Sequence, residues 1–376
     1  MNNKILFILL LIYIPCLMGF AHSHESFKNK NYFPEKEWRT STPEQQGMDS
    51  QALLNMYKIF GNQGRIIIIR NGYLITDYNQ SYLLKDIHHI HSCTKSIVSA
   101  LIGNAIEDGY IKNINHNVLS FFPEYKNIQN LDERKKKLTL YHLLTMSSGI
   151  QWSDNPNINS NQMSHSPDWG QYVFDQPMIE EPGQVWNYNS GGSQLLSVII
   201  QKTTGKSAQA YATEKIFKPL GITKVNWWKD QQGHSTAGWG LHLSSFDIAK
   251  IGYLFLRKGR WQDKQVIPEQ WVIESTKNHI SVESGFGRGS GYAYQWWVYT
   301  DLPFNAYKAW GSYGKHSVMI IIIPDLDMVV VLTGDNSADK RILKSFIIPS
   351  VKSSKPLSPN LEIANKLMSF IDSTSN

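Results

Sequence analysis

The sequence has very little cysteine. Only two Cys occur among 376 residues, Cys16 in an apolar N-terminal stretch and Cys93 in the body of the chain. If the N-terminal stretch is removed, Cys93 remains alone and no intramolecular disulfide can form. The sequence is therefore not a small disulfide-stapled domain, and its stability must come from a buried core, which this length permits.

A strong charge bias and internal repeats are also missing. The chain carries 37 basic and 31 acidic residues, a net charge of +6, which does not predict a nucleic-acid surface. Its one basic run, residues 134–137, follows two acidic residues and is typical of a solvated loop. No period of 20–50 residues recurs, which excludes a solenoid or propeller. With 41% hydrophobic residues, the chain can form one large domain or two interleaved ones.

The N-terminus has the pattern of an export signal. Lys4 precedes an apolar run over residues 5–18, and Gly19-Phe20-Ala21 supplies a small-x-small cleavage pattern. An uncleaved anchor is the alternative, but the run is shorter than the ~20 residues of a membrane-spanning helix. We expect residues 1–21 to be cleaved, leaving an exported, periplasmic or secreted protein with no stable membrane anchor.

Strand patterns occur near both ends of the chain. Residues 65–70 and 73–78 flank an Asn71-Gly72 turn, which predicts a hairpin. Further strands are expected late in the chain, the last two joined by a turn, at residues 292–299, 317–323 and 328–333. Helices are expected over 51–60, 339–348 and 361–371.

The middle of the chain differs from both ends. Residues 112–240 hold short helical patches, such as 141–144 and 195–202, between polar loops. This arrangement predicts an α+β fold whose antiparallel sheet is built from both termini and flanked by helices. We expect a sheet domain over 22–111 and 241–376 and a mostly helical inserted domain over 112–240, with a ligand cleft between them.

A Ser-x-x-Lys motif begins the most apolar helix pattern, residues 92–108. Residues three apart share a helical face, so the Lys95 amine can reach the Ser92 hydroxyl. The helix N-terminus adds backbone N–H groups and a positive field suited to an oxyanion. The string alone is weak evidence, because Ser337 and Lys340 form a second copy.

The surroundings of Ser92 are more specific. They resemble the serine β-lactamase-like superfamily, within it the class C and penicillin-binding-protein-related hydrolases, and there the esterase and 6-aminohexanoate-dimer hydrolase branch. The resemblance covers about residues 45–350 and implies a β-lactamase/transpeptidase-like fold. The matching segments occur in the family's order: residues 91–97, 108–111, 118–125, 138–149, 181–183, 186–188, 247–252 and 294–297.

The resemblance implies a nucleophile at Ser92, a base at Lys95 and a proton-transferring phenol at Tyr188. Ser190 stands where many members carry Asn, which favours an ester or linear amide over a β-lactam. We expect Ser190 to contact substrate.

The family's third motif, a basic residue two before a glycine, falls on residues 309–311. Gly311 fits it, whereas Ala309 leaves no partner for a substrate carboxylate, unless His316 supplies an imidazole. By the same resemblance, the oxyanion would be held by the N–H groups of Ser92 and Ser312.

Two rival sites are weaker. Cys93 could be a nucleophile, but its position turns it away from the face shared by Ser92 and Lys95, which favours a buried packing residue. His89 and His91 could share a strand face as metal ligands, but no suitably spaced partner accompanies them. We therefore expect no metal site, and no phosphate-binding glycine loop is present.

The sequence thus predicts an exported serine hydrolase that acts on a small-molecule ester or amide, without a cofactor or a nucleic-acid partner. The sequence does not indicate an oligomeric state. The alternatives are a β-lactamase or D-Ala carboxypeptidase, and a catalytically silent penicillin-binding-like scaffold.

Overall fold

The computed structural model describes residues 32–34, 37–60, 64–79, 87–154, 157–282, 291–299, 307–315, 318–334 and 339–374. The expected signal peptide, His316 and Ser337 lie outside these residues. Within them, the structure contains no helix with the length and hydropathy needed to cross a bilayer.

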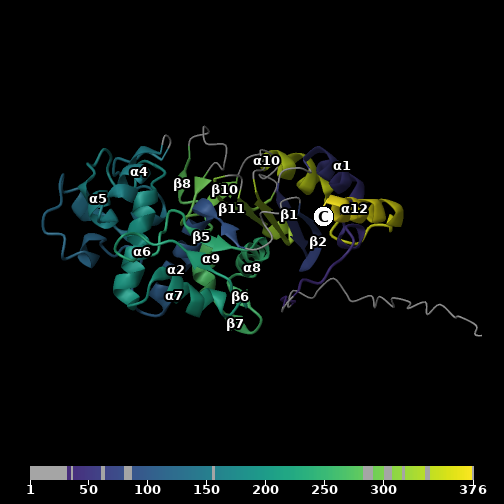
Figure 1. Ribbon diagram of the computed structural model, residues 1–376, viewed down its shortest axis with the longest axis horizontal. Helices are drawn as coiled ribbons and strands as arrows, with labels where there is room; N and C mark the ends of the chain where they lie inside the picture. Colours follow the sequence, from purple (N-terminus) through teal and green to yellow (C-terminus); the bar gives the residue numbers. More distant parts are fainter. Residues whose placement is uncertain are drawn as a thin grey trace, which may run out of the picture.

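An eight-stranded antiparallel sheet joins the two ends of the chain (Figure 1). Strand β1 (Arg65–Arg70) pairs with β2 (Tyr73–Asn79) on one side and with β13 (Met328–Thr333) on the other. The remaining strands follow β13 in the order β12 (Met319–Ile323), β11 (Ala309–Tyr313), β10 (Trp297–Tyr299), β9 (Gly291–Tyr292) and β8 (Ile280–Ser281). The expected sheet from both termini is confirmed.

Both faces of the central strands are buried. In β1, Ile67 and Ile69 enter one hydrophobic core, whereas Ile66 and Ile68 enter another on the opposite face. Helix α8 (Ser245–Leu256) packs on β12 and β13, while α1 (Ser50–Phe60) and α12 (Leu361–Thr374) pack together on the other side. This double covering explains why the strands are continuous apolar runs rather than alternating ones.

Helix α8 lies very close to the sheet. A Cβ built on Gly252 would lie 2.7 Å from Val329 Cγ1, so this position admits no larger side chain without displacing the helix. The strand and helix patterns of the sequence had not predicted α8.

The middle of the chain is mostly helical and lies at the left of Figure 1. Helix α6 (Ser190–Thr204) packs against α2 (Thr94–Glu107). Helix α2 also packs against α9 (Glu269–Ser275). The other elements around them are α3 (Leu140–Leu144), α4 (Ile158–His165), α5 (Trp169–Asp175), α7 (Ala208–Ala212), the small sheet of β3 (His88–His89), β5 (Leu241–Leu243) and β4 (Asn226–Trp227), and the hairpin of β6 (Arg260–Trp261) and β7 (Lys264–Gln265). The exact division into a sheet domain and an insert stays a prediction.

Two expected elements differ in detail. The helix expected from Ser92 begins at Thr94, after a 3₁₀ turn over His91–Cys93. The strand expected over 292–299 is interrupted between β9 and β10, because Gln295 adopts a φ of 63° and turns the chain. C-terminal to the sheet, the expected helix over 339–348 is divided into α10 (Asp339–Ile342), a π-helical turn and α11 (Ile348–Ser350).

Candidate active site

Ser92 lies on a tight turn at the entrance to α2. The residue before it, His91, has a φ of 49°, a left-handed conformation that non-glycine residues seldom adopt. Gly314, at the end of β11, closes the other side, since a Cβ there would lie 2.7 Å from Ile90 O and 3.3 Å from Ser92 N. The chain thus presents Ser92 in a strained turn between a helix start and a strand end, as is common at functional sites.

Lys95 lies one helical turn further along and is almost completely buried, at 1% exposure. Its Nζ donates to Ser92 Oγ over 3.1 Å and to Gly238 O over 2.7 Å. Within the described part of the chain no carboxylate lies at ion-pair distance from this amine. The predicted Ser–Lys pair is therefore formed, and it is held by uncharged groups.

Tyr188 reaches the same amine from the loop before α6. Its ring centroid lies 4.7 Å from Lys95 Nζ, a cation–π distance, and its ring stacks on Trp297 at 6.0 Å and 14°. Among the described residues no hydrogen bond connects the phenol to Ser92 or Lys95. The structure brings the Tyr188 ring to the pair, and proton transfer through its hydroxyl stays a prediction.

Ser190, at the first position of α6, lies beside the carbonyl that holds Lys95. A Cβ built on Gly238 would lie 2.9 Å from Ser190 Cβ, and the Ser190 N–H donates to Asp154 Oδ2. Asn189 caps the helix by accepting a bond from the Gly192 N–H. The positive ends of α2 and α6 therefore both lie at the Ser92–Lys95 pair.

The first residue of the expected third motif, Ala309, lies on the face of strand β11 that is turned away from Ser92. Ala309 packs into the core beneath α1 and α12, whereas Trp310 packs against the core that contains α2. A basic side chain at position 309 would therefore point away from Ser92. Gly311 lies on the same face as Ala309. Neighbouring atoms leave no room for a side chain there, because a Cβ would lie 2.6 Å from Ile320 O and 3.1 Å from Tyr299 Cε2. Trp310, not Ala309, occupies the strand position that faces the α2 side.

Ser312 is also differently placed from the expectation. Its hydroxyl is buried and bonds to Ser96 Oγ over 2.9 Å. Gly314 N donates to Val318 O, so the alternation of an antiparallel ladder directs the Ser312 N–H toward β12 as well. This register does not support Ser312 as an oxyanion donor. The Tyr313 N–H points the opposite way, to the edge where β10 begins opposite Gly311.

A family model described as Beta-lactamase matches residues 43–342. The chain belongs to the beta-lactamase family. This is a family of serine hydrolases and penicillin-binding proteins. The resemblance to the serine β-lactamase-like superfamily that the sequence indicated is therefore confirmed.

Curated relatives of the chain support this assignment at low identity. PbpX of Bacillus subtilis (strain 168), named as a penicillin-binding protein, is 25% identical over 288 residues, which cover 72% of this chain and 68% of PbpX. Protein flp of Staphylococcus aureus (strain MRSA252) is 24% identical over 305 residues, which cover 72% of this chain and 59% of flp. The chain thus spans less than two thirds of the length of flp.

Solved structures share the fold. A structure from Bacillus anthracis, titled as a 6-aminohexanoate-dimer hydrolase, matches with a TM-score of 0.65 at 20% identity. The match covers 89% of this chain and 88% of that protein's chain. The octameric penicillin-binding protein homologue from Pyrococcus abyssi has a TM-score of 0.62 at 21% identity and covers 82% and 78%. The β-lactamase/transpeptidase-like fold predicted from the sequence is confirmed.

In this family member, a buried polar network lies next to the Ser92–Lys95 pair. Gln295 Nε2 donates to the carbonyls of Leu143 and Leu144, and its Oε1 accepts a bond from Ser193. Its own carbonyl accepts a bond from Ser96, which lies one residue beyond Lys95. Through Gln295 the network therefore connects α2, α3, α6 and the turn between β9 and β10.

Sequence reasoning missed Gln295 and Gly238. Gln295 belongs to a segment that matches the family but has no chemistry of its own there, and Gly238 bonds to Lys95 only through its backbone carbonyl.

Three histidine rings cluster near Ser92. The His89 ring lies 4.0 Å from that of His91 and 5.0 Å from that of His242. His89 Nε2 accepts a bond from the Gly240 N–H, and His242 Nδ1 donates to the Gly240 carbonyl. Within the described ranges no three His, Cys, Asp or Glu side chains are grouped as a metal site would require. Through their bonds to Gly240, His89 and His242 support the loop that carries Gly238.

Cys93 packs in the core of this beta-lactamase-family chain. It is fully buried, its Sγ donates to Val318 O over 3.5 Å, and burial raises the pKa of the thiol to about 12. The expectation of a buried packing residue is confirmed.

We expect Cys93 to be inert toward thiol reagents in the folded protein. At pH 8 a thiol of pKa about 12 is roughly 1 part in 10,000 thiolate, and the reagent has no access to it. A disulfide-exchange colorimetric reagent should therefore titrate no thiol in native buffer and one per mature chain in 6 M guanidinium. Rapid native labelling would contradict the buried placement.

Proposed function

We propose that the protein is an exported serine hydrolase that cleaves an ester or amide bond through an acyl-enzyme on Ser92. The observation that carries the proposal is the Ser92–Lys95 pair: an alcohol and a buried amine 3.1 Å apart at the start of a central helix. A nucleophile within hydrogen-bond reach of its base is the arrangement that covalent catalysis requires.

In the proposed first half-reaction, Ser92 Oγ bonds to the acyl carbon while its proton passes to the unprotonated amine of Lys95. The oxyanion lies at the α2 N-terminus, against the Ser92 N–H and the edge of β11 at Tyr313. The bond to the leaving group then breaks, and the leaving group takes a proton from Lys95 or through Tyr188. In the second half-reaction a water molecule bonds to the acyl carbon while its proton passes to Lys95 or through Tyr188. The bond between the acyl carbon and Ser92 Oγ then breaks, Oγ takes the proton back by the same route, and the acid is released.

The surroundings favour an uncharged acyl group. Trp310, and not a basic residue, takes the position of strand β11 that faces the α2 side. Tyr188 and Trp297 stack next to Trp186, whose ring centroid lies 5.5 Å from that of Trp297. Aromatic faces beside Lys95 suit an apolar substrate better than the carboxylate of a penicillin or a muropeptide.

Two alternative functions have some support. A β-lactamase or D-Ala carboxypeptidase is suggested by the name of PbpX and by the penicillin-binding homologue among the solved structures. A silent penicillin-binding-like scaffold is disfavoured by the intact Ser92–Lys95 pair.

The test uses the protein from residue 22 onward with four reagents: a fluorophosphonate probe, p-nitrophenyl butyrate, a chromogenic cephalosporin and a D-Ala-D-Ala peptide. We expect labelling at Ser92 and ester turnover. Turnover of the cephalosporin or the peptide in preference to the ester would favour the first alternative, and absence of labelling and of all turnover would favour the scaffold. Export is tested separately by the mature N-terminus of the protein recovered outside the cytoplasm, which we expect at residue 22.

A further inference from the structure

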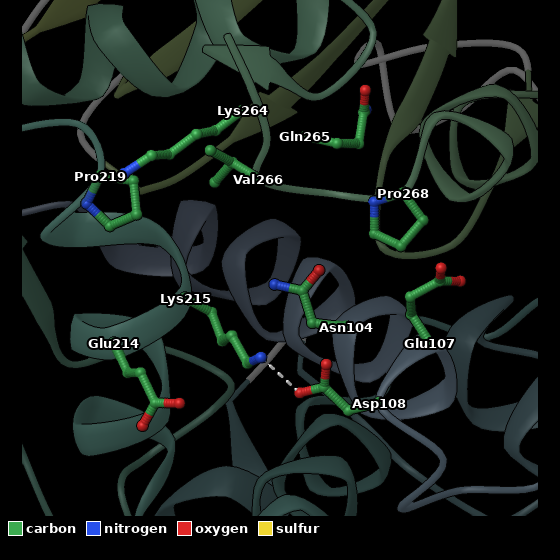
Figure 2. A pocket seen from close by; sticks show the side chains of 10 residues that line it. All are labelled: Asn104, Glu107, Asp108, Glu214, Lys215, Pro219, Lys264, Gln265, Val266 and Pro268. Carbon is green, nitrogen blue, oxygen red and sulfur yellow. Dashed lines mark ion pairs between the residues drawn. The ribbon is translucent and has the colours of Figure 1, made fainter. Parts of the chain in front are cut away.

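A cavity of about 290 Å³ lies at the opposite end of α2 from Ser92 (Figure 2). Asn104 and Glu107 from the last turn of α2 line it, together with side chains from the β6–β7 hairpin and the segment around Lys215. Lys95 and Glu107 are twelve residues apart on one helix, which at 1.5 Å per residue separates them by ~18 Å. The cavity is therefore distinct from the candidate active site.

Asn104 gives this cavity an unused hydrogen-bond donor. The residue is only 4% exposed, and its side-chain Nδ2 has no acceptor within the described part of the chain. Figure 2 shows the Asn104 amide extending into the middle of the space between the lining elements. A buried amide without a partner lowers stability, so its presence at a cavity indicates a ligand group that accepts from it.

The charged side chains of the cavity fall into two sets. Asp108 forms an ion pair with Lys215 at 2.6 Å and accepts a bond from Tyr211, and Glu214 pairs with Lys206. These groups are already neutralised.

Lys264 and Glu107 form the second set. Neither makes an ion pair with another described residue, and Figure 2 shows them on opposite sides of Asn104. The wall of the cavity thus carries one cation and one anion that form no ion pair with another described residue, together with the unpartnered Asn104 amide.

We infer that this cavity binds a small zwitterion of the α-amino-acid type. Its carboxylate accepts from Asn104 Nδ2 and pairs with Lys264, and its ammonium pairs with Glu107. A volume of about 290 Å³ is large enough for a free amino acid. Val266 and Pro268 supply apolar wall for a short side chain.

The test is calorimetric titration of the mature protein with alanine, with N-acetylalanine, which lacks the ammonium, and with alaninamide, which lacks the carboxylate. We expect saturable binding of alanine and at least tenfold weaker binding of both derivatives. Asn104→Leu, Lys264→Gln and Glu107→Gln should each weaken alanine binding at least tenfold. Lys258→Gln, which removes an exposed ion pair outside the cavity, is the matched control and should leave binding unchanged.

Folding and the active site are separated from binding by two further measurements. Asn104→Leu should raise the melting temperature while it abolishes binding, because it removes an unpartnered buried amide; loss of binding with a lowered melting temperature would instead indicate structural damage. Alanine should still bind after Ser92 is blocked by a fluorophosphonate. The inference fails if alanine does not bind, if N-acetylalanine binds equally well, or if the Ser92 block abolishes binding.

Discussion

Ser92→Ala should abolish covalent labelling by a fluorophosphonate and reduce kcat/KM for p-nitrophenyl butyrate by at least ~1,000-fold. The substitution removes the hydroxyl that forms the proposed acyl-enzyme, and residual rates then rest on the oxyanion donors and substrate binding. Because Ser92 is partly exposed and lies before α2 rather than within it, the variant should keep the melting temperature of the parent within a few degrees. Intact-mass spectrometry of the labelled protein gives the first measurement, and initial rates give the second.

The chain offers a matched control for this result. Ser337 begins the second Ser-x-x-Lys string, so Ser337→Ala removes a hydroxyl from the same motif elsewhere in the sequence. This variant should label and turn over ester as the parent does. Labelling that survives in Ser92→Ala but disappears in Ser337→Ala would move the nucleophile to the second string and refute the proposed site.

The sheet was predictable because its strands are local and strongly apolar. The runs at residues 65–70 and 328–333 and the turn at Asn71-Gly72 could form little else, and the register pairs Ile67 with Val331. Their pairing across the chain followed from the α+β pattern. Helix α8 was missed although Ser244 and Asp247 form a capping pattern at its start, because the helix is apolar nearly all round and tertiary packing on β12 and β13 decides its place.

The Ser92–Lys95 pair was predictable for a similar reason. Two residues three apart at a helix start lie on one face whatever the rest of the fold does, and the structure places Nζ 3.1 Å from Oγ. Tyr188 is almost a hundred residues away, and only the resemblance to a family indicated it.

The placement of the third motif was predicted one residue away from the strand position that faces α2, for a physical reason. In an ordinary half-buried strand the alternation of apolar and polar residues shows which side chains face the core. Strand β11 is covered on both faces, so Ala309, Trp310 and Ser312 carry no such signal. A shift of one residue moves every side chain to the other face, and this shift separates the expected motif from the observed one.

Gly238 illustrates a different limit. Its carbonyl accepts from Lys95 at 2.7 Å, and its lack of a side chain allows the close approach of Ser190, but neither the acceptor nor the approach can be inferred from one glycine in a sequence. The loop that positions this carbonyl is itself held by side chains far away in sequence, through Gln194 to the Ala237 N–H and through His89 to the Gly240 N–H. Only the folded chain brings these groups together.

Substitution of Lys95 should separate proton acceptance from mere positive charge. Lys95→Met keeps most of the buried volume without the amine, and Lys95→Arg keeps a charge that cannot be released at any ordinary pH. If Lys95 takes the proton of Ser92, both variants should lose about 100- to 10,000-fold in kcat/KM for the ester, the range for removal of a general base. Both should also label with the fluorophosphonate much more slowly than the parent, measured as a second-order rate constant.

The pair of variants distinguishes the possible roles of this residue. Activity that survives in Lys95→Arg but not in Lys95→Met would mean that Lys95 acts through its charge, and the proton would have to leave by way of Tyr188. Lys206→Met is the matched control, since it removes an exposed amine that pairs with Glu214 far from Ser92 and should leave the rate unchanged. Because Lys95 is buried and bonds to Gly238 O, circular dichroism and the melting temperature of each variant must match those of the parent before its rate is compared. A folded Lys95→Met variant that keeps its rate within tenfold of the parent would refute the amine as base.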